Sequence, residues 1–186
     1  MKQVLIISGH PNLAQSTANA LIIQEVQKQL PNVEVRFLDK LYPDYQIDVS
    51  AEQDALSRAD VIVWQFPFYW YSTPALLKKW IDDVHTHGFA YGSTGDKLHG
   101  KPLIISFTTG GSAQDYSVGE HEGMELPAFF PQFSQTAHLC GMAFQSPVYS
   151  QSMHYIAGVS GADELAKVQA NALDHAQRLI QLIQSV

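Results

Sequence analysis

Three short and largely apolar runs, each followed by a polar loop, most strongly limit how this chain can fold. The runs are residues 4–7, 61–66 and 102–108. They do not alternate between apolar and polar residues, which is typical of strands that helices cover on both faces of a sheet. A parallel sheet between two layers of helices is therefore expected.

Helical spacing of apolar residues predicts the segments that connect these strands. After the first run, apolar residues recur from Ala18 until Pro31 ends the pattern, with Ser16 or Thr17 as the N-cap. The further predicted elements are strands 33–38 and 142–148 and helices 51–58, 74–84, 128–139 and 162–183. Five strands that alternate with helices imply right-handed crossovers, with a binding crevice at the carboxyl ends of the strands.

Length, charge and composition restrict the class of protein. With 186 residues and no linker or repeat, the chain is expected to form one domain, residues 1–186. Its net charge of −7 includes no block of like charges, which argues against nucleic acid as a partner and against a polybasic membrane anchor. Charged residues are only 16% and apolar residues 46%, so part of the surface is expected to lie in a homo-oligomer contact.

The expected location is the cytoplasm. Cys140 is the only cysteine, so no internal disulfide is possible, and it is expected to be a buried thiol. The N-terminal apolar run is too short for a secretory signal, and no apolar run approaches the roughly 20 residues that a membrane helix requires.

The loop after the first strand carries hydroxyl and amide side chains at a helix start. Free backbone N–H groups and the helix dipole at such a place can bind a phosphate without a lysine. An alternative is that Ser16 and Thr17 only cap the helix. Neither a G-x-x-x-x-G-K-[ST] nor a G-x-G-x-x-G pattern is present, which argues against an ordinary nucleoside triphosphate or dinucleotide site. The candidate phosphate-binding residues are His10, Ser16, Thr17 and Asn19.

Two further loops have compositions that favour a flat ligand. Four aromatic residues, Phe68 to Tyr71, follow a buried strand, where they could cover an isoalloxazine ring, pack beneath the next helix or form a dimer contact. In "FTTGGSAQDY", Gly110 and Gly111 allow the main chain to approach a ligand and permit positive φ, so their amides could face a ring edge. By itself, this second sequence could also be a tight turn.

Several separated motifs together resemble the NAD(P)H:quinone oxidoreductase family of flavodoxin-like flavoproteins. The motifs are "SGHPN…ST.N", "ADVIVWQFPFYWYSTPALLKKWID", "GFAYG" followed by "LHGK", and "TTGGSAQDYSVGEHEG". The fold is accordingly expected to be a flavodoxin-like three-layer α/β sandwich with strand order 2-1-3-4-5. The segment "LYPD…AEQ.ALSRAD" is similar to that of short bacterial ancillary oxidoreductases of glutathione-gated potassium efflux systems.

This resemblance implies an activity and partners. It implies a homodimer with two flavin sites at its interface, and ping-pong transfer of a hydride from NADH or NADPH through flavin N5 to a quinone or other electrophile. FMN is favoured over FAD, because the chain lacks the C-terminal extension of the mammalian enzymes. It also implies a possible contact with a membrane potassium efflux transporter, which would place a cytoplasmic protein at the periphery of the inner membrane.

The resemblance also implies residue roles. Tyr116 matches a tyrosine that hydrogen-bonds the reduced flavin or the acceptor oxygen, and His121 matches the acid/base histidine, one residue earlier than in the mammalian spacing. Residues near the phosphate would be His10, Ser16, Thr17 and Asn19; residues bordering the ring would be Pro67, Phe68, Tyr69, Trp70 and Tyr71; residues at its pyrimidine edge would be Thr108, Thr109, Gly110 and Gly111.

Two other functions are alternatives to this enzyme. A regulatory subunit of a potassium efflux system would need no motif that distinguishes it from the enzyme. An electron-transfer flavodoxin ranks lower, because the aromatic and glycine loops favour a substrate-admitting site. His85 and His87 alternate as a metal pair would, but no carboxylate or cysteine completes a ligand spacing, so no metal site is expected.

Overall fold

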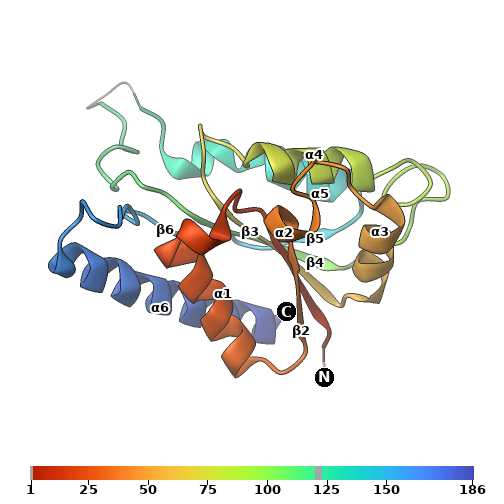
Figure 1. Ribbon diagram of the computed structural model, residues 1–186. Coiled ribbons are helices and arrows are strands. Elements are labelled where there is room, and N and C mark those ends of the chain that lie inside the picture. The colour runs from red at the N-terminus through yellow and green to blue at the C-terminus, as the bar shows by residue number, and fades with distance from the viewer. Residues whose placement is uncertain (1, 120–122) are drawn as a thin grey trace.

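A computed structural model describes residues 2–119 and 123–186 and shows a parallel sheet between two helical layers (Figure 1). The strands are β1 (Val4–Ser8), β2 (Val33–Phe37), β3 (Val61–Pro67), β4 (Pro102–Thr108), β5 (Ala143–Phe144) and β6 (Val148–Ser150). The helices are α1 (Thr17–Gln29), α2 (Leu38–Leu41), α3 (Val49–Arg58), α4 (Ala75–Val84), α5 (Pro131–Leu139) and α6 (Ala162–Ser185), with 3-10 turns η1 (Leu13–Gln15) and η2 (Leu126–Phe129).

The strand order β2-β1-β3-β4-β5 confirms the expected topology, and all pairs are parallel. Residues of β1 alternate between the two faces. Leu5 and Ile7 belong to the core under α3, α4 and α5, whereas Val4 and Ile6 belong to the core under α1 and α6. Both faces are therefore covered, which explains why the strands are apolar without alternation.

The last predicted strand, 142–148, divides into two short strands. β5 pairs with the start of β4, and β6 pairs with its end, in the register Ser106 to Val148 and Thr108 to Ser150. Pro147 lies between them and has no N–H to donate to a ladder, so the pairing is interrupted there. The consequence for the site is that Ser150 lies beside Thr108 at the carboxyl edge.

Other element boundaries also differ from the prediction. The helix expected at 128–139 begins at Pro131, which is favoured at a first helical position, and a 3-10 turn precedes it. Leu38, expected to end a strand, instead begins the short helix α2. None of the helices in the part of the chain that the structure describes is long and apolar enough to cross a bilayer.

Candidate functional site

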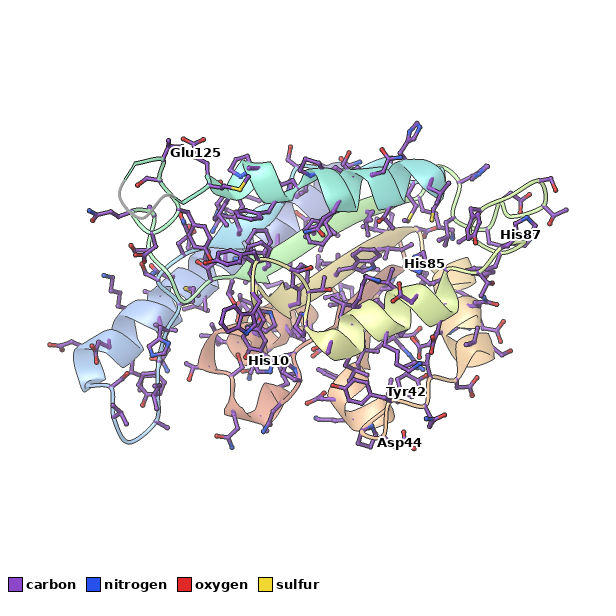
Figure 2. All side chains as sticks on the ribbon, turned by 90° about the horizontal axis from the view of Figure 1, so that it is seen from above. His10, Tyr42, Asp44, His85, His87 and Glu125 are labelled. Atoms are coloured by element: carbon purple, nitrogen blue, oxygen red, sulfur yellow. The ribbon has the colours of Figure 1, made fainter. Side chains whose placement is uncertain are left out.

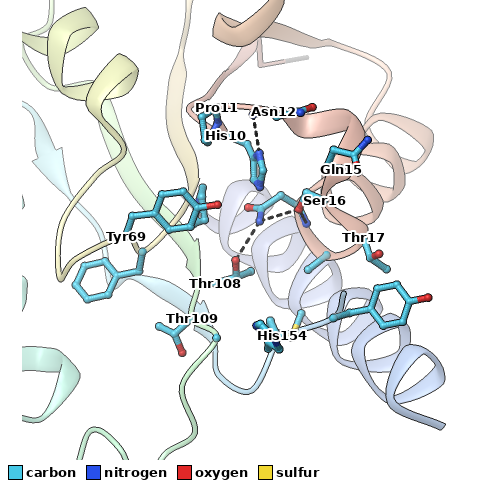
Figure 3. Close-up of a pocket in the computed structure, with 17 residues that line it drawn as sticks. His10, Pro11, Asn12, Gln15, Ser16, Thr17, Tyr69, Thr108, Thr109 and His154 are labelled. Atoms are coloured by element: carbon cyan, nitrogen blue, oxygen red, sulfur yellow. Dashed lines mark hydrogen bonds between the residues drawn. The ribbon is translucent and has the colours of Figure 1, made fainter. Parts of the chain in front are cut away.

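A cavity of about 320 Å³ lies at the carboxyl edge of the sheet, between the ends of β1, β3 and β4 and the start of α1 (Figure 3). No lysine or arginine is among the described residues that line it. Ten of the thirteen residues predicted to bind a cofactor do line it: His10, Ser16, Thr17, Asn19, Pro67, Phe68, Tyr69, Thr108, Thr109 and Gly110.

The start of α1 supplies hydrogen-bond donors to this cavity. Ser16 is the N-cap, and its hydroxyl oxygen accepts from the backbone N–H of Asn19 at 3.1 Å. The N–H groups of Thr17 and Ala18 belong to the first turn and have no intrahelical acceptor. Both residues line the cavity, so the capping role and the ligand-facing role coexist at this helix start.

Asn19 ties the helix start to the end of β4. Its side-chain amide donates to Thr108 Oγ1 at 3.0 Å and to Ser16 Oγ at 3.3 Å (Figure 3). Its carbonyl oxygen accepts from Gln65 Nε2 at 2.8 Å. Asn19, Gln65 and Thr108 are all buried, so these amides and hydroxyls form a fixed polar floor rather than a solvated surface.

His10 stands on the wall of the cavity as a neutral imidazole. Its Nδ1 accepts from the backbone N–H of Asn12 at 3.1 Å, which places the proton of the neutral ring on Nε2. Burial lowers its pKa, although the nearby Asp39 carboxylate opposes the effect. At neutral pH His10 is therefore a hydrogen-bond donor with no charge.

The aromatic loop after β3 divides into two parts. Phe68 and Tyr69 line the cavity, and Tyr69 lies edge-on to His10 with ring centroids 6.3 Å apart. Trp70 and Tyr71 have positive φ, 48° and 63°, which turns the loop away, so neither lines the cavity. Trp70 is 92% exposed, whereas Tyr71 stacks on Phe129 at 5.4 Å.

In the glycine loop after β4, two backbone N–H groups remain available to donate to a ligand. The N–H of Thr109 donates to the carbonyl of Ser150 at 2.9 Å, so it cannot serve a ligand. Neither Gly110 N–H nor Gly111 N–H has an acceptor among the described residues. Both glycines have negative φ, so positive φ is not their reason for being glycine. At Gly111 a Cβ would lie 3.1 Å from Tyr116 Cε2, which makes close packing the reason.

Of the two predicted catalytic residues, Tyr116 and His121, the structure describes only Tyr116. Tyr116 lies edge-on to Tyr71 with ring centroids 6.4 Å apart, and it borders a second hollow of about 300 Å³ together with Leu126 and Tyr149. Burial raises the pKa of its phenol, with a further contribution from Tyr71 and Asp115. His121 lies outside the described residues.

Sequence reasoning missed one side of the cavity. Met153, His154 and Tyr155 line it from the loop after β6, and Asn12 and Gln15 line it from the loop before α1. The position of the first group follows from the pairing of Ser150 with Thr108 in the structure, because any loop after Ser150 must begin at the same edge of the sheet. The sequence pattern alone ended that strand at Val148.

His85 and His87, the pair that alternates in the sequence, do not line this cavity. Figure 2 shows His85 beside the end of α4 and His87 in the loop that follows, both apart from His10. Among residues 2–119 and 123–186, no group of three His, Cys, Asp or Glu side chains is arranged to hold a metal ion. Cys140 is buried, as expected.

Comparison with known proteins shows which proteins this chain resembles. Residues 2–179 match the family described by a flavodoxin-like fold. The glutathione-regulated potassium-efflux system ancillary protein KefF of Enterobacter sp. (strain 638) is 44% identical over 177 residues, 95% of each chain. The general stress protein 14 of Treponema denticola, solved in complex with FMN, has 33% identity and a TM-score of 0.85, covering 97% of this chain and 99% of its own.

A third comparison extends the same group. An NADPH-quinone reductase of P. pentosaceus is 28% identical, with a TM-score of 0.75, covering 94% of this chain and 97% of its own. The resemblance drawn from the sequence motifs is thereby confirmed. From the match over residues 2–179 and the similarity along nearly the whole length of these relatives, the chain belongs to the flavodoxin-like fold family.

Proposed function

We propose that the cavity binds FMN and that the protein is a two-electron NAD(P)H:quinone oxidoreductase. The observation that carries the proposal is the combination of donors on the cavity wall. Thr17 and Ala18 N–H groups and the Ser16 and Thr108 hydroxyls lie at one side, and the Tyr69 ring and Gly110 amide at another. A phosphate monoester and a flat heterocycle match these two parts.

Two comparisons support the proposal. A structural relative at 33% identity was solved in complex with FMN, and another at 28% identity is an NADPH-quinone reductase. The lack of lysine or arginine on the wall also fits a phosphate bound by helix N–H groups and hydroxyls. Bound FMN would accept a hydride from NAD(P)H and pass it to a quinone or related electrophile.

The residues of the chain would hold and orient this group. His10, Ser16, Thr17 and Asn19 would hold the phosphate end, with Pro67, Phe68, Tyr69, Thr109 and Gly110 around the ring. Thr108, which the sequence resemblance assigned to the pyrimidine edge, is proposed at the phosphate end instead, because Asn19 Nδ2 donates to its Oγ1 at 3.0 Å. Tyr116 has a raised pKa and stays protonated at neutral pH, so its hydroxyl can donate to an acceptor oxygen. His121 remains a proposed proton donor, and Trp70, Tyr71 and Gly111 remain proposed at the outer border.

The test is FMN binding followed by turnover. We expect FMN to bind the purified chain with a flavin absorption spectrum and the complex to oxidise NADPH or NADH when menadione is added. The variant Thr108→Val keeps the side-chain shape and removes one hydroxyl, so FMN affinity should fall roughly 10-fold. Thr136→Val, on α5, is the matched control and should bind FMN like the wild type. Failure of the wild-type chain to bind FMN would refute the proposal.

A second candidate function is that of an ancillary subunit of a glutathione-regulated potassium efflux system, bound to the cytoplasmic side of its membrane transporter. The observation that favours it is the 44% identity to the KefF protein over 95% of both chains. Co-purification of the chain with such a transporter from detergent-solubilised membranes is expected, and it should survive Tyr116→Phe. No co-purification at near-physiological salt would refute this second function.

A further inference from the structure

A chain of buried hydrogen bonds leads from the cavity through the sheet to α6. Asn19 Oδ1 accepts from Gln65 Nε2 at 2.8 Å, and Gln65 Oε1 accepts from Ser106 Oγ at 2.5 Å. Ser106 Oγ lies 2.8 Å from His175 Nε2. Gln65, Ser106 and His175 are at most 1% exposed, so water does not compete for these bonds. The helix α6 is thereby connected to the floor of the cavity.

Beyond His175, this series of hydrogen bonds ends at the guanidinium of Arg178. His175 Nδ1 lies 2.9 Å from Ser150 Oγ, and Ser150 Oγ accepts from Arg178 Nη2 at 2.8 Å. The same guanidinium donates through Nη1 to the carbonyl of Tyr149 at 3.2 Å and through Nε to Asp174 at 2.8 Å. Arg178 itself is exposed, and its guanidinium can only donate hydrogen bonds.

Hydroxyls, amides and a neutral imidazole can each donate on one side and accept on the other, so the chain has two internally consistent proton arrangements. In the first, Ser150 donates to His175 Nδ1, and the Nε2–H of His175 donates to Ser106. In the second, every bond between Ser150 and the cavity is reversed, and His175 carries its proton on Nδ1. Burial and Arg178 lower the pKa of His175 to about 3, although Asp174 opposes them, so the ring holds one proton at neutral pH.

Arg178 distinguishes the two arrangements. In the first arrangement, every hydrogen bond along the path that leads from Arg178 to Asn19 has one donor and one acceptor. In the second, Ser150 Oγ would accept from both Arg178 and His175, and its own hydrogen would have no acceptor among the described residues. Ser150 is 9% exposed, so an unmade bond there costs free energy.

The consequence appears at the cavity. In the first arrangement Asn19 donates to both Ser16 Oγ and Thr108 Oγ1, so the hydrogen of each hydroxyl remains for a ligand. In the second, Asn19 would present its carbonyl oxygen and take up both hydrogens. The ligand would then face oxygen lone pairs, which repel an anion.

We propose that Arg178 and His175 are positioning residues that direct the Ser16 and Thr108 hydroxyl hydrogens into the cavity, and so select a ligand with a fully ionised phosphate. The identity of that ligand as FMN rests on the proposed function. The proton arrangement does not depend on it, because every hydrogen bond of this network joins two groups of the protein itself.

The first test measures the tautomer of His175 in the wild-type protein without flavin. Long-range ¹H–¹⁵N NMR of histidine-labelled protein at pH 7.5, with the ring assigned by loss of its signals in His175→Gln, reports which nitrogen carries the proton. Protonated Nε2 with an unprotonated Nδ1 supports the proposal. A proton on Nδ1, or a doubly protonated ring, overturns it.

The second test removes the donor that sets the direction. Arg178→Met keeps the aliphatic stem and removes the guanidinium, and Arg58→Met makes the same change on α3, where Arg58 pairs with Glu34. We expect Arg178→Met to weaken FMN binding about 5- to 20-fold. Binding of riboflavin, which lacks the phosphate, should change by less than about twofold. Arg58→Met should change neither.

The outcomes separate this proposal from the proposed function. Equal weakening of FMN and riboflavin, or no change in either, contradicts the positioning role. If the wild-type chain binds neither flavin, the proposed function fails while the His175 tautomer still decides the proton arrangement. Should Arg178→Met not fold, the tautomer in the wild-type protein remains the deciding result.

Discussion

The ring nitrogens of His85, a half-buried residue at the end of α4, link the core to acid sensitivity. Its ring lies edge-on to Trp64 and Trp80, with centroids 5.8 and 5.4 Å away. Neither ring nitrogen makes a hydrogen bond of good geometry to the described residues, and burial lowers the pKa to about 4, although the Ile81 backbone and the Asp82 carboxylate oppose the shift. Between pH 6.5 and about 4 the unfolded chain binds a proton that the folded protein does not, so stability falls as the pH falls through this window.

The variant His85→Phe should reduce this acid sensitivity. It keeps the aromatic contacts with Trp64 and Trp80 and removes the two unpaired nitrogens, so stability at pH 7.5 should be equal or higher. The loss of unfolding free energy between pH 7.5 and 5 should be smaller than in the wild type by about 2 kcal/mol. Urea unfolding at the two pH values measures it, with the exposed His87→Gln as control. An unchanged pH dependence would contradict the assignment.

At the scale of elements, one buried carboxylate joins two helices and a strand on one side of the sheet. Glu52 on α3 is 0% exposed, and its Oε1 accepts from Arg36 Nη2 of β2 at 2.6 Å and from the Tyr42 hydroxyl at 2.5 Å. Its Oε2 accepts from Trp80 Nε1 of α4 at 2.9 Å. Burial and the Glu52 carboxylate raise the pKa of Tyr42 to about 12.

Replacing Glu52 by alanine should therefore destabilise the protein strongly. The change leaves the Trp80 and Tyr42 donors and the partly buried Arg36 without their acceptor, which typically costs about 3–5 kcal/mol. Chemical denaturation should show a lower midpoint with an unchanged slope. The control is Glu34→Ala, whose carboxylate is exposed and should matter by less than about 1 kcal/mol. Equal effects of the two variants would argue against this role.

The sequence predicted the elements whose apolar pattern alone identifies them. It missed the boundaries that depend on a neighbouring strand or on the position of a proline. β1, β3 and β4 are covered on both faces, so their apolar runs are unambiguous. The split between β5 and β6 and the 3-10 turn before α5 depend on where the neighbouring β4 and two prolines lie. Because parallel strands end at one edge, most residues of the cavity could also be predicted.

Other residues of the site could not be predicted, for a physical reason. Trp70 and Tyr71 turn away because of positive backbone φ, which composition does not encode. Gln65, His175 and Glu52 are polar residues whose burial depends on partners distant in the sequence. Sequence patterns assign such residues to the surface, so the buried hydrogen-bond network could be found only from the three-dimensional structure.

At the scale of the whole molecule, the exposed apolar residues favour the proposed homodimer. Trp70 is 92% exposed on a loop beside the cavity, and Val118 and Met124 are 77% and 52% exposed. Exposed aromatic residues of this kind are often the anchors of an interface. A second chain that packed on Trp70 would lie next to Tyr69, which lines the cavity.

Sedimentation velocity should therefore give twice the mass of one chain at micromolar concentration. Trp70→Ser should raise the dimer dissociation constant roughly 10-fold or more. Leu173→Ser, which changes an exposed apolar residue on α6, is the control and should leave the dissociation constant unchanged. A wild-type monomer at every concentration would exclude the homodimer.

The central claim is that a phosphate binds at the start of α1 without basic side chains, with a flat ring beside the Tyr69 and Gly110 loops. A crystal structure of the protein grown with saturating FMN tests it most directly. The account predicts the phosphate within hydrogen-bond distance of the Thr17 and Ala18 N–H groups and of the Ser16 and Thr108 hydroxyls. An empty cavity under these conditions, or FMN bound elsewhere on the molecule, would contradict it.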